Sequence, residues 1–106
     1  MNLTVVLPDG SARPLTCAPK GSMMDAMRAG GVPVRAECGG AMACATCHVH
    51  VDAAWIARTG PAGDEEADLL DMSDYRAENS RLACQIKLSP ALDGLTVALQ
   101  LDAFEG

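Results

Sequence analysis

Four of the five cysteines in this 106-residue chain follow a spacing that suits a metal–sulfur centre. Three crowd into one short stretch and the fourth lies far along the chain, in the pattern C-x5-C-x2-C-x36-C, at Cys38, Cys44, Cys47 and Cys84. Four thiolates can hold a [2Fe-2S] unit, two on each iron. Glycine and alanine fill most of the intervening loop, and such small residues let backbone N–H groups approach sulfur atoms closely. The pattern therefore favours an iron–sulfur cluster over a bare metal ion.

Other cysteine chemistries fit the sequence less well. The run C-A-T-C-H from Cys44 to His48 matches the attachment motif for c-type haem, but that interpretation leaves Cys38 and Cys84 without a role. Structural zinc sites usually pair two C-x2-4-C knuckles, and this chain has one. A Rieske centre would use His48 and His50 and leave two cysteines unused. An odd number of cysteines without a sign of secretion disfavours disulfides.

Length and composition bound the architecture. We expect a single domain over residues 1–106, because a chain of this length cannot enclose two cores. Hydrophobic residues make up 49% of the chain but include one Trp, one Tyr and one Phe, so the core must consist of Val, Leu, Met and Ala. No apolar run approaches the ~20 residues that span a bilayer. With no leader pattern before the first strand, we expect a reducing compartment. At Cys17, on or just after a predicted strand, we expect a buried, inert thiol.

The negative charge is concentrated in one short segment. Residues 64–74 hold six acids and no base, whereas the rest of the chain holds eight acids and eight bases, so this segment carries the whole net charge of −6. Nucleic-acid binding needs a basic face, which disfavours a nucleic-acid partner. A positively charged protein surface is the favoured partner instead.

Short strands and helices are predicted along the chain. Apolar and alternating runs predict strands over residues 1–7, 13–17, 48–51, 85–88 and 95–101. A Pro-Asp-Gly turn joins the first two strands as a hairpin. Helices are predicted from Ser22 to the glycine pair at 30–31, over 53–58 with Asp52 as the cap, and from Asp64 to about Met72. These elements indicate an α+β domain with a mixed sheet.

Two histidines follow the cysteine loop. Alternation along the strand 48–51 puts His48 and His50 on one face and two valines on the other. Because His48 comes directly after Cys47, we expect it to hydrogen-bond neighbouring backbone and brace the loop. His50 is expected to be an ordinary surface residue.

The acidic helix is predicted to present one charged face. At 100° per residue, Asp64, Asp68 and Asp71 fall on one side, with Leu69 and Leu70 toward the other. Acids in the first turn suit the positive end of the helix dipole, but Asp68 and Asp71 lie too far along to benefit. We therefore interpret that pair as part of a docking face.

Two stretches of the sequence resemble the adrenodoxin/putidaredoxin class of [2Fe-2S] ferredoxins. They are Cys38-Gly39-Gly40-Ala41-Met42-Ala43-Cys44-Ala45-Thr46-Cys47-His48 and Ser80-Arg81-Leu82-Ala83-Cys84-Gln85-Ile86. The likeness extends along nearly the whole chain, and the five-residue first gap separates it from plant-type ferredoxins, whose first gap is four. The resemblance implies a β-grasp (ubiquitin-like) ferredoxin fold, with a mixed sheet, a few short helices and a cluster-binding loop.

The resemblance also implies roles for individual residues. The ligands of one [2Fe-2S] cluster per chain would be Cys38, Cys44, Cys47 and Cys84. The residues immediately around the cluster would be Gly39, Gly40 and His48. The segment from Asp64 to Asp71 is similar to the adrenodoxin interaction helix, so the docking acids would be Asp64, Glu65, Glu66, Asp68 and Asp71. Phe104 would be a displaced equivalent of the exposed terminal aromatic that putidaredoxin-like members use in partner contact.

The function implied by this resemblance is electron transfer, not enzyme catalysis. The carrier would take electrons from an NAD(P)H-dependent FAD ferredoxin reductase and pass them to a cytochrome P450. The alternatives are electron supply to iron–sulfur cluster assembly or to a Rieske-type oxygenase, and, from another class, a zinc-stabilised interaction domain. We expect a monomer without membrane insertion, in a bacterial cytoplasm.

Overall fold

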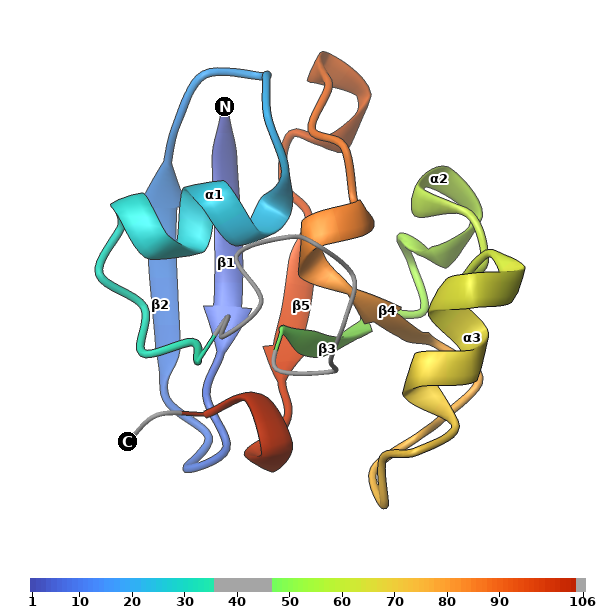
Figure 1. The fold of residues 1–106 in the computed structure, drawn as a ribbon. Coiled ribbons are helices and arrows are strands. Elements are labelled where there is room, and N and C mark those ends of the chain that lie inside the picture. The colour runs from blue at the N-terminus through green and yellow to red at the C-terminus, as the bar shows by residue number, and fades with distance from the viewer. Residues whose placement is uncertain (36–46, 105–106) are drawn as a thin grey trace.

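A five-stranded mixed sheet organises the chain in the computed structural model, which describes residues 1–35 and 47–104 (Figure 1). The strands are β1 (Asn2–Val6), β2 (Ala12–Thr16), β3 (His48–Val51), β4 (Ser80–Leu82) and β5 (Thr96–Leu99). The helices are α1 (Met23–Ala29), α2 (Ile56–Thr59) and α3 (Asp64–Leu70), with 3-10 helices at Ala83–Gln85, Pro90–Leu92 and Leu101–Ala103. Within these ranges no helix has the length and apolar character needed to cross a membrane.

The sheet order is β2-β1-β5-β3-β4. The predicted hairpin pairs β1 with β2 antiparallel, β1 pairs with β5 in parallel, and β3 lies antiparallel to both β5 and β4. This order places the first and last strands, β1 and β5, side by side in the middle of the sheet, where β5 joins the hairpin to the β3–β4 pair. The arrangement is mixed, as the sequence predicted.

Helix α1 packs across β1 and β2 with a methionine-rich face (Figure 1). Its first turn carries the predicted capping box, in which Ser22 accepts from the Asp25 backbone N–H and Asp25 accepts from that of Ser22. The buried Met23, Met24 and Met27 join valines and leucines in the core. Gly30 follows the helix, and a Cβ there would collide with the Leu15 side chain of β2. A larger residue at this position would force the end of the Leu15 side chain to move.

Two predicted elements are wrong in their placement. The strand expected at residues 85–88 is instead β4, at 80–82, followed by a 3-10 helix. Residues 86–88 run beside the start of α1, because Met23 N–H donates to Ile86 O and Leu88 N–H donates to Gly21 O. Asp52 does not cap a helix: its side chain accepts from the Ala54 N–H, and α2 begins at Ile56.

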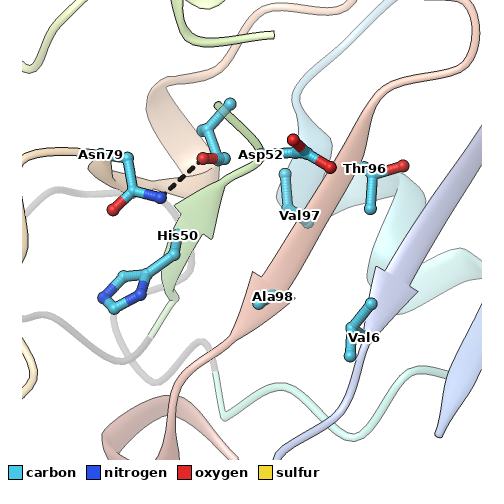
Figure 2. Close-up of a pocket in the computed structure, with 8 residues that line it drawn as sticks. Val6, His50, Asp52, Asn79, Thr96, Val97 and Ala98 are labelled. Atoms are coloured by element: carbon cyan, nitrogen blue, oxygen red, sulfur yellow. Dashed lines mark hydrogen bonds between the residues drawn. The ribbon is translucent and has the colours of Figure 1, made fainter. Parts of the chain in front are cut away.

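The two faces of the sheet differ. The register aligns Val5, Val97 and Val51, all buried, on the side of the core, and the adjacent row of half-buried residues on the other. That second row, Val6, Ala98 and His50, lines a shallow depression of about 200 Å³, shown in Figure 2. Its rim is fixed by the Asn79 side-chain amide, which donates to the Val51 backbone carbonyl at 2.7 Å. None of the residues that line this depression is a cysteine.

Candidate metal centre

Two of the four predicted ligand cysteines meet at the end of the β3–β4 pair. His48 is paired with Leu82 across the two strands, and the Ala83 N–H donates to the Cys47 carbonyl at 2.9 Å. This extension of the ladder brings Cys47, just before β3, against Cys84 in the 3-10 helix that follows β4. The 3-10 turn therefore orients the distant fourth cysteine toward Cys47.

The local environment of the two thiols suits metal ligation. Cys47 is fully buried and Cys84 is half-buried, so the pair lies at the boundary between core and solvent. A hydrogen bond from the Cys47 thiol, the largest of several influences, lowers the pKa of Cys84 to about 6. The thiolate is the form that binds iron, and a readily deprotonated thiol beside a second one fits two of the four positions around a [2Fe-2S] cluster. The predicted ligands Cys38 and Cys44, with Gly39 and Gly40, lie outside the described residues.

Gln85 adds a polar contact to the sulfur of Cys84 that sequence reasoning missed. Its side-chain amide Nε2 donates to Cys84 Sγ at 3.4 Å, and its backbone carbonyl accepts from Arg81 Nη2 at 3.3 Å. A donor on a ligand sulfur stabilises negative charge there. The amide stands directly after the fourth cysteine of the motif, and this adjacency was the available signal.

Arg81 and Glu66 form a buried ion pair beneath this turn. The residues are 6% and 4% exposed, and Arg81 Nε and Nη2 donate to the two carboxylate oxygens of Glu66 at 2.7 and 3.3 Å. The Leu82 N–H adds a third bond to Glu66, at 2.8 Å. Arg81 Nη1 also donates to two backbone carbonyls, those of residues 59 and 60. Helix α3 is thus tied to β4, the strand that leads into the turn carrying Cys84.

This pair corrects the prediction that Glu66 is a docking acid. The side chain faces inward and cannot meet a partner's surface. The reason is helical spacing, since Glu66 lies four residues before the buried Leu70 and shares its side of α3. The sequence contains that four-residue spacing, but the prediction treated every acid of the segment as exposed because the segment is acidic throughout.

His48 is fully buried in a cluster of polar side chains rather than bonded to neighbouring backbone. Its Nε2 lies 2.7 Å from Ser80 Oγ and its Nδ1 3.2 Å from Ser73 Oγ. Both carboxylate oxygens of Asp102 lie 3.3 Å from Nδ1, and Ser73 donates to that carboxylate. Burial lowers the pKa of His48 below its ordinary value. The nearby carboxylate of Asp102 acts in the opposite direction but has the smaller effect. His48, which directly follows Cys47, is therefore linked through its ring to the segment after α3 and to the 3-10 helix Leu101–Ala103.

The second histidine lies where alternation predicted. The rings of His48 and His50 are 5.3 Å apart, on the face opposite Val49 and Val51. His50 is half-buried, so it is not the ordinary surface residue that the sequence predicted. Its Nε2 donates to the Tyr75 carbonyl at 2.7 Å.

The remaining predicted docking acids lie on the surface. Asp64, Glu65 and Asp68 are exposed on α3, which stands beside β4 at the edge of the sheet (Figure 1). Asp71 is exposed directly after the helix and pairs with Arg76 at 3.0 Å, so part of its charge is neutralised. Whether these acids meet a partner stays a prediction.

Two further residues were assigned from the sequence. Phe104 is half-buried against the core and forms a β-bridge with Val34, so it is held in place and only part of its ring is accessible. Cys17 is half-buried rather than fully buried, with its backbone bonded to Met1.

Comparison with known proteins agrees with this geometry. Residues 6–89 match the family described as the 2Fe-2S iron-sulfur cluster binding domain. A relative, the 2Fe-2S ferredoxin CtmE of Castellaniella defragrans, is 46% identical over 87 residues, or 81% of each chain. A ferredoxin structure from Rhodopseudomonas palustris HaA2 matches with a TM-score of 0.90 and 42% identity over 97% of this chain and 99% of that one. Putidaredoxin, in its covalent complex with putidaredoxin reductase, matches with a TM-score of 0.87 and 36% identity over 93% of this chain and 97% of that one.

The matched family and the related structures define a small electron carrier built on the β-grasp fold, as the sequence predicted. The chain belongs to the 2Fe-2S iron-sulfur cluster binding domain family, within its adrenodoxin/putidaredoxin class, and its cofactor is a [2Fe-2S] cluster.

Proposed function

We propose that this protein shuttles single electrons from an NAD(P)H-dependent FAD ferredoxin reductase to a cytochrome P450, through a cluster held by Cys38, Cys44, Cys47 and Cys84. The observation that carries the proposal is the meeting of Cys47 and Cys84 at the boundary between core and solvent, beside a helix with exposed acids. The solved complex of the relative putidaredoxin with its reductase supports a flavoprotein donor. The relatives named above come from bacteria, which supports a bacterial cytoplasm as the site of action.

The chain's own residues have three tasks in this function. The cluster, when bound, supplies a centre that accepts and releases one electron. The half-buried position of Cys84 keeps the path from this ligand to a partner short, and the Gln85 amide stabilises negative charge on its sulfur. The Arg81–Glu66 pair holds the turn that carries Cys84 against α3. These contacts limit movement at the site, so little rearrangement is needed when the charge changes.

The exposed acids of α3 would guide the partner. Asp64, Glu65 and Asp68 give one edge of the molecule a negative field that attracts a basic surface and raises the association rate. Screening over about 8 Å at physiological salt makes this attraction depend on ionic strength. Complexes of this kind are small and short-lived, which suits a carrier that must leave one partner for the next.

The test is reconstitution with partners from the same organism. Holo-protein immobilised at low salt would retain partners, which a salt step would release for identification by mass spectrometry. The proposal expects a flavoprotein reductase and a P450, which together with the carrier should oxidise the P450 substrate at the expense of NAD(P)H. Recovery of a cysteine desulfurase or an assembly scaffold, without a P450, would assign the carrier to cluster assembly instead.

A further inference from the structure

The segment that follows β5, residues 100–104, is bonded to the chain on both sides of the stretch that holds three of the predicted ligand cysteines. It contains the 3-10 helix Leu101–Ala103 (Figure 1). Cys38, Cys44 and Cys47 fall between residues 35 and 48 in the sequence. We refer to residues 100–104 as the strap, because they contact residues 34–35 before that stretch and residue 48 after it.

Before the cysteines, the strap pairs with the backbone of residues 34–35. The Arg35 N–H donates to the Ala103 carbonyl at 2.8 Å, and Val34 and Phe104 form an antiparallel β-bridge. Val34 and Ala103 are buried, and Phe104 is half-buried against the core. Apolar side chains thus shield this contact from water, and it holds the chain three residues before Cys38.

After the cysteines, the strap is bonded to the residue that follows Cys47. The Gln100 N–H donates to the His48 backbone carbonyl at 3.1 Å. The Asp102 carboxylate lies 3.3 Å from Nδ1 of the His48 ring, which is fully buried. The same short segment therefore contacts both the backbone and the side chain of the residue next to this ligand candidate.

Holding both ends of a loop favours whatever the loop binds. A loop with fixed ends has less conformational freedom, so the ligands that it carries separate from a metal less readily. His48 is also held by the pairing of β3 with β4 and β5, so this side does not depend on the strap alone. Residues 34–35 lie outside the sheet strands and depend on the strap more. Local opening of such a short contact costs less free energy than unfolding of the sheet.

We propose that the strap retains the [2Fe-2S] cluster, that its detachment from residues 34–35 is the step that precedes cluster loss, and that Phe104 anchors it. Phe104 is thereby a positioning residue for the cluster, a role separate from the partner contact that the family resemblance implies for a terminal aromatic. The inference rests on the ligand set proposed above and does not depend on which partners the carrier serves.

The test is the rate at which an excess of iron chelator bleaches the visible absorption of the holo-protein, measured anaerobically at a temperature where the fold is intact. Phe104→Ala should speed bleaching about tenfold, whereas Phe104→Leu, which keeps an apolar anchor, should lie within about twofold of wild type. Arg35→Pro removes the N–H that donates to Ala103 and should speed bleaching about fivefold. Arg35→Ala keeps that N–H and is the matched control for the contacts of the side chain.

Leu92→Ala separates retention of the cluster from general stability. Leu92 is buried in the 3-10 helix Pro90–Leu92, at the opposite end of β5 from the strap. Because Leu92 is more deeply buried than Phe104, its truncation should lower the midpoint of denaturant unfolding further, yet leave the bleaching rate close to wild type. Hydrogen exchange followed by mass spectrometry is the second measurement. Peptides that cover the strap should exchange faster in Phe104→Ala, and peptides that cover the β1–β2 hairpin should not.

Bleaching rates that follow the order of the unfolding midpoints would overturn the inference, because the cluster would then leave through global unfolding. Wild-type bleaching rates in both Phe104→Ala and Arg35→Pro would overturn it as well. Cys38→Ser should change the absorption spectrum itself, which the strap variants should leave unchanged. A wild-type spectrum for Cys38→Ser would overturn the ligand set, and this failure is distinct from that of the strap.

Discussion

Replacing Glu66 by glutamine should destabilise the protein without the loss of docking that a surface acid would cause. The substitution leaves Arg81 buried and charged, with its bidentate partner reduced to a neutral amide, and it weakens the bond from the Leu82 N–H. Because both residues are less than a tenth exposed, solvent cannot replace the lost charge. Breaking a buried ion pair on one side costs about 3–5 kcal/mol. That loss is a large part of the total free energy of unfolding of a natural domain, which is about 5–15 kcal/mol.

The assay is denaturant unfolding of the holo-protein under anaerobic conditions, followed by visible absorption and far-UV circular dichroism. Glu65→Gln, one residue earlier and exposed, is the control and should lie within about 0.5 kcal/mol of wild type. In the double variant Glu66→Gln/Arg81→Met the buried charge is gone, so it should lose less stability than the two single variants together. Equal stabilities for Glu66→Gln and Glu65→Gln, combined with weaker reductase binding by Glu66→Gln at low salt, would refute the inward orientation.

Three further predictions concern docking, redox potential and packing. Asp68→Asn should slow association with the reductase several-fold at low salt, and Asp71→Asn should slow it less because Arg76 already pairs with that acid; stopped-flow rates that do not depend on ionic strength would contradict both. Gln85→Leu removes the amide donor from Cys84 Sγ and should lower the reduction potential by roughly 20–60 mV, the equivalent of one hydrogen bond for a one-electron couple, whereas a potential within about 10 mV of wild type in a spectroelectrochemical titration would exclude that role. Gly30→Ala should cost about 1–3 kcal/mol because its Cβ collides with Leu15, while Gly63→Ala, with open space around it, should cost little; equal unfolding midpoints would show that the helix end can shift.

Local patterns in the sequence were sufficient for the elements that local physics decides. The β1–β2 hairpin follows from the apolar run at residues 3–7 and the turn after it, with Gly10 at φ 90°, and α1 follows from a capping box and a methionine stripe. The strand expected at 85–88 failed because its apolar residues Ile86 and Leu88 are buried beside α1 and not in the sheet. Alternation reports burial on one side of a segment and does not say which neighbour covers it.

In the candidate site, too, features set by the local sequence could be predicted, and features set by long-range contacts could not. Cysteine spacing predicts Cys47 and Cys84 as ligands from residue type and order alone, and the fold brings these two side chains into contact. The environment of His48 could not be predicted, since Ser73, Ser80 and Asp102 reach it from 25, 32 and 54 residues away. Only the folded sheet brings such distant polar groups together. The inward orientation of Glu66 could have been predicted from its four-residue spacing to Leu70, which places both side chains on the same side of the helix.

The most direct test of the central claim is the rate of substrate oxidation in a system reconstituted from the reductase, this protein in its holo form and the P450 of the same organism. The account predicts that oxidation requires the carrier, rises with its concentration to saturation, and falls as salt is added. A carrier that the reductase reduces fully, but that produces no oxidation by the P450 above the level without it, would contradict the account.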